Sequence, residues 1–390
     1  MPYEFSLPSP DDLSRGQRIA LLAQAEDTFI ITGCPGSGKT TVAMMRARNK
    51  GADPKHHYTV WANLLYGYLV NCSGRLGVSE QHFSTFYSWF YARYRTFAFN
   101  YGKVDITTVV SKLDNDSKKY SELQLDEGQD MELEIRCHLS NIANKLVICM
   151  DPAQDVKGQC DVSTNEITKT IDYLKNNLNK RVNHFALNTN WRNTEAIFHF
   201  SQEIVPEIRN QIRVDEFAKP GGKPPKYKLT NTLNDSLVEI EKIIKNSPGT
   251  NIGVFDDSLE NLHILSKHLN SKGIRNTVYD SHEHRKRRRP EKLRFLKSME
   301  NIVLCTFISC KGLEFNTVIF MDISNCSDTL KNKKGYYVGA TRAKDDLILL
   351  ASNRYRIPSW FERIPESKNG KTLYKDSNKQ SVWPDINDLV

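Results

Sequence analysis

Residues 29–41 read Phe29-Ile30-Ile31-Thr32-Gly33-Cys34-Pro35-Gly36-Ser37-Gly38-Lys39-Thr40-Thr41. A short apolar, β-branched run leads into a glycine-rich turn, and residues that favour helix follow the turn. A P-loop requires this order of strand, loop and helix. The stretch therefore predicts an α/β fold of the P-loop NTPase type. The alternative is a glycine-rich loop that binds another anion, or none.

The chemistry of a P-loop explains the spacing of these residues. Glycines let backbone N–H groups turn inward around a polyphosphate, and the N-terminus of the following helix adds its positive dipole end. Lys39 is expected to reach the β- and γ-phosphates, and the Thr40 hydroxyl to ligate Mg²⁺. The residues expected to bind the nucleotide here are Gly33, Gly36, Ser37, Gly38, Lys39 and Thr40.

Composition places the chain in a broad class. Its 390 residues suggest two or three domains, and 39% hydrophobic with 26% charged residues is typical of a globular protein. A net charge of +8 leans mildly towards nucleic acid or another polyanion. The eight cysteines show no CxxC pair, which indicates reduced thiols in a cytoplasmic protein. We find no secretory signal and no apolar run of membrane-spanning length.

Two further apolar runs end in polar side chains. Leu123-Gln124-Leu125 leads into Asp126 and Glu127, and residues 146–150 lead towards Gln154. Sites in α/β sheets collect at the carboxyl ends of strands. Beside a P-loop, Asp126 is expected to hold Mg²⁺ and Glu127 to polarise the attacking water. Gln154 is suited to sensing a γ-phosphate or a water.

The second half of the chain predicts another α/β unit. Strand and helix patterns alternate from residue 226 to residue 280, and strands are expected again at 317–322 and 346–351. Two successive α/β sheets imply a structural duplication. Residues 102–119 are polar and are expected to form a loop.

Two stretches admit both a functional and a structural interpretation. The aromatic-rich segment 82–95 could stack nucleic-acid bases, or its rings could form core at helical spacing. The basic run Arg285–Arg289 could grip phosphates, or it could be a solvated loop.

Taken in order, these motifs resemble those of the UvrD/Rep-type superfamily 1 DNA helicases, from about residue 13 to residue 351. The resemblance implies two tandem RecA-like domains with parallel sheets, residues 1–185 and 186–390, that hold ATP and Mg²⁺ between them. It implies that Gln17 reads the adenine and that Glu127 is the general base. It further implies that Gln154 couples the γ-phosphate to the DNA face.

The resemblance also assigns residues of the second half. By this resemblance, Trp191 lies beside the base and Arg192 contacts the γ-phosphate of the nucleotide. Glu314 contacts its ribose, and Arg342 resembles the family's arginine finger. Positions that face DNA in this family are less well kept, for example Tyr87 and Ile308 where the family has histidines. The remaining candidates for nucleic-acid contact are Asn63, Trp89 and Thr306.

Length is the second departure from the family. Only about 36 residues separate Trp89 from Asp126, whereas a folded accessory subdomain needs roughly fifty or more. The sequence therefore predicts a reduced two-domain ATPase that acts as a translocase or helicase-like motor on single-stranded DNA. The alternative is an ATP-gated switch or loader that regulates a partner, such as a nuclease or another defence or repair protein, without unwinding DNA by itself.

Overall fold

The computed structural model describes residues 7–24, 27–100, 103–155, 166–211, 213–287, 289–353, 356 and 358–362. Within these residues the chain forms two compact units. The first unit runs to Thr189 and takes in Gln211–Glu216, and the second contains Asn190–Asn210 and the chain from Phe217 onward. Among the described residues, no helix is both long enough and apolar enough to cross a membrane.

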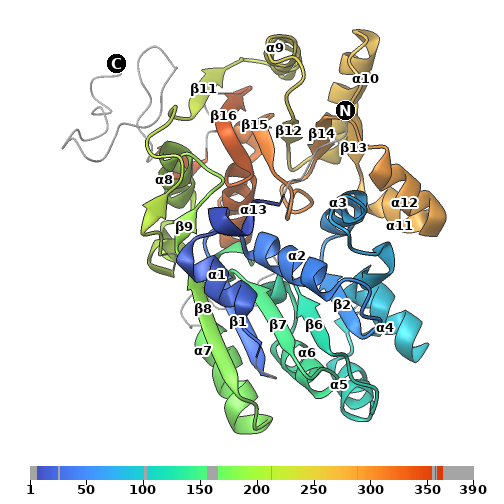
Figure 1. The fold of residues 1–390 in the computed structure, drawn as a ribbon. Coiled ribbons are helices and arrows are strands. Elements are labelled where there is room, and N and C mark those ends of the chain that lie inside the picture. Colours follow the sequence, from blue (N-terminus) through green and yellow to red (C-terminus); the bar gives the residue numbers. More distant parts are fainter. Residues whose placement is uncertain are drawn as a thin grey trace. The chain divides into compact units, whose positions relative to one another are not determined.

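The first unit is built on a six-stranded parallel sheet in the order β3-β2-β6-β7-β1-β8 (Figure 1). β1 lies inside the sheet, where its residues Thr28–Thr32 pair with β7 and its residues Thr28–Gly33 pair with β8. The strands are β1 (Thr28–Gly33), β2 (His56–Val60), β3 (Phe83–Thr85), β6 (Glu122–Leu125), β7 (Leu146–Met150) and β8 (Val182–Leu187).

Helices bury both faces of this sheet. Ile30 and Ile148 join a core cluster with Phe90 of α4 and Val109 of α5. Phe29 faces the other way, where the Arg46 guanidinium of α2 lies 5.4 Å from its ring centre. The alternation follows from the two-residue period of a strand. The helices are α1 (Arg15–Leu22), α2 (Lys39–Lys50), α3 (Asn63–Ser73), α4 (Phe86–Tyr94), α5 (Ile106–Asp114), α6 (Leu133–His138) and α7 (Glu166–Asp172).

The expectation of a loop over residues 102–119 is wrong for α5. Asp105 caps this helix by accepting a hydrogen bond from the Thr108 backbone N–H at 3.0 Å. Val109 and Leu113 of its apolar face are buried. Two threonines, a serine and a lysine of α5 make the segment look polar overall, although its apolar positions follow helical spacing. Before α5 lies a short antiparallel hairpin, β4 (Phe99–Asn100) with β5 (Lys103–Val104).

The second unit repeats the architecture with another six-stranded parallel sheet, in the order β11-β16-β15-β12-β14-β13. Its strands are β11 (Lys226–Leu229), β12 (Ile252–Phe255), β13 (Thr277–Tyr279), β14 (Ile302–Cys305), β15 (Phe315–Phe320) and β16 (Ala343–Ala351). Its helices are α8 (Glu195–Ile204), α9 (Leu233–Lys245), α10 (Leu259–Ser271), α11 (Ser281–Lys286), α12 (Arg289–Lys297), α13 (Leu330–Ala340) and α14 (Ser359–Glu362).

The second unit has a core of its own. Ile240 of α9 and Leu262 of α10 are buried against Val254 and Leu304 of the sheet. The strand and helix pattern expected between residues 226 and 280 is present in the order anticipated. A two-stranded sheet, β9 (Thr189–Asn190) with β10 (Glu216–Phe217), lies where the chain passes from the first unit to the second.

Candidate nucleotide site

The loop between β1 and α2 has open donors. Gly36 and Gly38 have φ of 78° and 87°, which only glycine adopts readily. Gly38 is the residue before α2, and as a glycine it has no side chain with which to cap the helix N-terminus. The Ser37 hydroxyl is buried without a hydrogen-bond partner among the described residues. Uncapped N–H groups and an unsatisfied hydroxyl around one loop fit an anion such as a polyphosphate.

Lys39 folds back over this loop. Its ammonium donates to the carbonyls of Gly33 at 2.8 Å and Cys34 at 3.0 Å, and it lies 3.8 Å from an Asp151 carboxylate oxygen. The residue is only 9% exposed. A buried ammonium needs hydrogen-bond acceptors. Phosphate oxygens, which are charged, would be stronger acceptors than the two carbonyl oxygens.

Gln17 holds the loop from α1. The Ser14 backbone N–H donates to Gln17 Oε1 at 2.9 Å, and Gln17 Nε2 donates to the Ser37 carbonyl at 3.0 Å. Both ends of the amide are therefore engaged within the protein. Contact with an adenine edge would require these hydrogen bonds to be exchanged.

Thr40 and Asp126 meet at the carboxyl end of β6. The Thr40 hydroxyl donates to Asp126 Oδ2 at 2.8 Å, and the Tyr58 hydroxyl donates to the same oxygen at 2.9 Å. Burial raises the pKa of Asp126, the neighbouring charge of Glu127 raises it further, and the two hydroxyl hydrogen bonds oppose the shift. A cation would relieve this buried negative charge.

The donor set at Thr40 and Asp126 fits Mg²⁺. Hydroxyl and carboxylate oxygens are the hard ligands that Mg²⁺ takes, and it usually completes its shell with water and substrate phosphates. The described residues contain no group of three or more His, Cys, Asp or Glu that could hold a metal by themselves. The residues therefore fit a magnesium ion that arrives with a nucleotide better than a resident metal.

Glu127 sits in a strained backbone conformation. Its φ of 58° and ψ of 42° lie in the left-handed region, which costs a non-glycine residue about 1–2 kcal/mol. Strain of this kind tends to collect at functional sites. The turn aims the carboxylate at Gln129, whose Nε2 donates to Glu127 Oε2 at 2.5 Å.

Gln129 and Asp151 extend the network, and we did not assign them roles from sequence. Gln129 Oε1 accepts from the Asp151 backbone N–H at 2.9 Å, and Gln154 Nε2 donates to Asp151 Oδ2 at 2.6 Å. Gln129 therefore links the ends of β6 and β7, and with them Glu127 and Gln154. Both residues lie within the polar turns that follow these strands, so their position was the available signal.

In the second unit, a turn presents Trp191 and Arg192. Asn190 Oδ1 accepts from the backbone N–H groups of Arg192 and Asn193, both at 3.0 Å. Trp191 is 40% exposed as a result. Such a turn is the local structure that asparagine favours.

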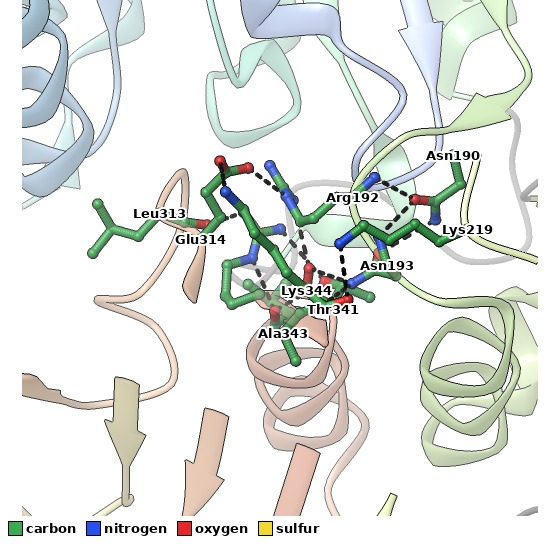
Figure 2. Close-up of polar contacts among 11 residues, drawn as sticks. Asn190, Arg192, Asn193, Lys219, Leu313, Glu314, Thr341, Ala343 and Lys344 are labelled. Atoms are coloured by element: carbon green, nitrogen blue, oxygen red, sulfur yellow. Dashed lines mark hydrogen bonds and ion pairs between the residues drawn. The ribbon is translucent and has the colours of Figure 1, made fainter. Parts of the chain in front are cut away.

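Arg192 and Lys344 converge on Glu314 (Figure 2). Arg192 Nε lies 3.0 Å from Glu314 Oε2, and Lys344 Nζ lies 2.6 Å from Oε1. Burial acts to raise the pKa of Glu314, but the two cations outweigh it and lower the pKa to about 2. Glu314 is therefore ionised at neutral pH and stabilised by the two cations.

Arg342 is buried within the second unit, with 2% of its surface exposed. Its guanidinium donates to the carbonyls of Val338 at 3.0 Å and Leu313 at 3.2 Å. Asn193 holds the chain on both sides of Arg342, because its Nδ2 donates to the carbonyls of Thr341 at 3.1 Å and Ala343 at 2.6 Å. Asn193 is thus a third residue, after Gln129 and Asp151, to which sequence reasoning gave no role.

The candidates for nucleic-acid contact are scattered. Asn63 is the first residue of α3 and is half-buried, and the Thr306 hydroxyl after β14 lies 3.0 Å from that of Ser309. Trp89 is 5% exposed and its indole N–H donates to the Tyr120 hydroxyl at 2.9 Å, so it offers little ring surface to a base. Of the run Arg285–Arg289, the side chains of Arg285, Arg288 and Arg289 lie outside the described residues.

No protein-family model matches this chain, and no curated protein matches it in sequence. Among solved structures, S. cerevisiae Dbp5 bound to RNA and ADP BeF3 is similar over 88% of this chain and 84% of its own, with a TM-score of 0.52 and 11% identity. The C-terminal domain of a possible DNA helicase from Lactobacillus plantarum WCFS1 matches 44% of this chain and 92% of its own, with a TM-score of 0.32 and 19% identity.

The similarity to Dbp5 shows the fold. The two six-stranded parallel sheets form tandem RecA-like domains, as the sequence predicted. At this level of identity, any activity must be argued from the site itself.

Proposed function

We propose that this protein is an ATPase motor on single-stranded DNA, a reduced relative of the UvrD/Rep-type superfamily 1 helicases. One observation carries the proposal. The first unit brings together a P-loop lysine, the Thr40–Asp126 pair and the strained Glu127. These are the groups that phosphoryl transfer to water needs: a phosphate cradle, oxygen ligands for Mg²⁺, and a carboxylate to orient the water.

In this proposal each residue has a separate task. The N–H groups of the P-loop and Lys39 bind the phosphates, and Mg²⁺ held by Thr40 and Asp126 neutralises their charge. Glu127 accepts the proton of the attacking water, with Gln129 fixing its carboxylate. Gln154 relays the state of the phosphate to the rest of the unit.

The second unit would complete the reaction. Arg192 and Arg342 are the cations expected to stabilise charge on the transferred phosphoryl group, and Glu314 and Trp191 to contact the nucleoside. Hydrolysis then depends on both units, so that binding and release of ATP can drive a cycle of movement along the strand. Asn63 and Thr306 remain the proposed contacts to the nucleic acid.

Three substitutions test the chemistry. Lys39→Ala, Glu127→Gln and Arg342→Ala are each expected to reduce ATP turnover at least a hundredfold, because removal of one transition-state or acid–base group costs about this much. Arg275→Ala is the matched control, since its side chain is 87% exposed. Turnover like wild type in any of the three variants would contradict the proposal.

A second candidate function is an ATP-gated switch that regulates a partner such as a nuclease. One observation favours it: between the end of α4 at Tyr94 and the start of β6 at Glu122, the described residues contain only the β4–β5 hairpin and α5. This leaves no room for an inserted subdomain that could separate strands. The ATPase rate with and without single-stranded DNA distinguishes the two functions. Strong stimulation supports the motor, whereas a rate that ignores DNA and responds to a partner protein supports the switch.

A further inference from the structure

Three aromatic rings lie exposed between the last turn of α4 and the hairpin strand β4. Tyr91 is 42% exposed, Phe97 71% and Phe99 44%. We call Tyr91, Phe97 and Phe99 the hairpin patch. Large exposed aromatics are costly in water, and a group of them on one surface indicates a binding site. The other aromatics of this segment behave as core, because Phe86, Trp89 and Phe90 are buried.

The backbone is shaped to present these rings. Arg95 ends α4 with φ of 53°, in the left-handed region, and its N–H donates to the Tyr91 carbonyl at 2.9 Å. This turn brings Phe97 back over Tyr91, so that the two rings stack at 27° with centres 4.7 Å apart. A non-glycine residue held at positive φ tends to mark a functional feature.

Hydrogen bonds and an ion pair hold the segments that carry the patch. Arg93 is paired with Asp116 at 2.6 Å and also donates to the Tyr120 hydroxyl at 2.9 Å. The Asp105 backbone N–H donates to the Ala98 carbonyl at 2.9 Å and closes the base of the hairpin. The exposed rings are therefore preorganised, and little conformational entropy would be lost when a ligand binds them.

The patch continues as a row of rings towards the end of β2. The ring centre of Phe99 lies 4.3 Å from that of Tyr87, and the ring centre of Tyr87 lies 4.9 Å from that of Trp61, which directly follows β2. Asn63, a candidate for nucleic-acid contact, is two residues further on. The spacing of these ring centres is that of aromatic groups in contact. Tyr87 and Trp61 are only partly buried, so these contacts connect Phe99 to the end of β2.

Charge favours a polyanion as the occupant. From Phe83 to Val104 the chain contains no aspartate or glutamate, while Arg95 and Lys103 are exposed beside the patch. Burial raises the pKa of Tyr87, and the charges of Glu132 and Asp130 raise it further, so these two carboxylates lie near the inner end of the row. Phosphates are therefore expected on the outer side, near Arg95 and Lys103, with bases turned towards the rings.

We propose that the hairpin patch is a stacking platform for the unpaired bases of a single-stranded nucleic acid. Rings with flanking cations are the general means by which proteins hold single strands without reading their sequence. The inference rests on the proposed function, since a motor on single-stranded DNA must hold the strand. It adds a site that is separate from the nucleotide site.

Oligonucleotide binding tests the platform. Each stacked ring contributes roughly 1–3 kcal/mol, so Phe97→Ala is expected to weaken binding of an oligo(dT) about tenfold in fluorescence anisotropy at fixed salt. Phe97→Trp is expected to restore the affinity, and Phe97→Leu is not, because leucine keeps apolar surface without a π-face. Ile264→Ala, at a position 38% exposed in α10, is the control and should bind like wild type.

An abasic oligonucleotide of equal length separates stacking from charge. It keeps the phosphates and lacks the bases, so wild type and Phe97→Ala are expected to bind it equally. If Phe97→Ala weakens binding of both oligonucleotides equally, the platform is overturned. Unchanged binding of oligo(dT) would also overturn it, and would assign the patch to a protein partner.

The ATPase rate separates failure of the platform from failure of the proposed function. If DNA stimulates ATP hydrolysis and Phe97→Ala binds oligo(dT) as tightly as wild type, the platform is rejected and the motor is not. Base-dependent binding without hydrolysis by wild type supports the platform and rejects the motor.

Discussion

At the scale of single residues, Glu127 shows how a local conformation that the sequence does not favour can serve chemistry. Its carboxylate leaves the chain from a left-handed residue, although glycine would fit there at lower cost. The position therefore exchanges stability for the placement of a proposed general base.

This strain predicts an unusual order of stability. Glu127→Gly and Glu127→Ala both remove the carboxylate and should both abolish hydrolysis. Glu127→Gly is expected to be more stable than Glu127→Ala by about 1 kcal/mol, because glycine adopts φ of 58° without a steric penalty. Urea unfolding of the two variants measures the difference.

Glu134 provides the control for this comparison. It is the second residue of α6, where φ is negative and glycine is less favourable than alanine, by up to about 1 kcal/mol in a helix interior. The sign of the Gly-versus-Ala difference should therefore reverse between positions 127 and 134. An alanine variant more stable than the glycine variant at both positions would show that Glu127 carries no backbone strain.

A buried histidine in β2 makes stability depend on pH. His56 is 1% exposed, and burial is the main cause that lowers its pKa to about 4. His82 and Lys50 lower the pKa further, whereas the charges of Glu122 and Asp53 oppose the shift. The folded chain therefore keeps His56 neutral at pH values where the unfolded chain, with a pKa near 6.5, binds a proton.

The sign of the pH effect follows from this difference. Between pH 6.5 and about 4 the unfolded state binds more protons, so the free energy of unfolding falls as pH is lowered. We expect His56 to account for a loss of about 2 kcal/mol between pH 7 and pH 5. Urea unfolding of His56→Gln at both pH values should show a smaller loss than wild type. His263→Gln, at an exposed position, should keep the wild-type dependence.

At the scale of elements, the turn at residues 190–193 holds the junction between two other elements, the helix α13 and the strand β16. Asn193 is fully buried and donates to the carbonyls on both sides of Arg342, where α13 ends and β16 begins. In the proposed mechanism Arg342 acts in the transition state, so its placement should affect the rate more than nucleotide affinity.

Asn193→Ala tests this positioning role. We expect kcat for ATP to fall about tenfold with little change in nucleotide binding, measured by titration with a fluorescent ADP. Ser201→Ala, at another buried polar position in the second unit, is the control for general destabilisation. A rise in KM with kcat unchanged would show that Asn193 serves binding rather than placement.

At the scale of the molecule, sequence reasoning identified the strands and the turns of the site, because their patterns are local. The P-loop and Asp126-Glu127 are each recognisable within a few residues. The pairing of Arg192 with Glu314 joins positions 122 residues apart, and the strand order that allows it leaves no local pattern. Trp89 was misleading for a related reason, since helical spacing cannot tell which face of α4 is buried.

Each unit has a separate core, and this predicts two unfolding transitions. Leu113 belongs to the core of the first unit and Leu262 to that of the second, and both are fully buried. Loss of a buried leucine side chain costs about 2–5 kcal/mol. In calorimetry of the full chain, ADP with Mg²⁺ should raise the midpoint temperature of one transition, because the P-loop lies in the first unit. Leu113→Ala should lower the midpoint temperature of that ADP-sensitive transition, and Leu262→Ala should lower that of the other one. A single transition that ADP and both substitutions shift together would mean that the two cores unfold as one cooperative body.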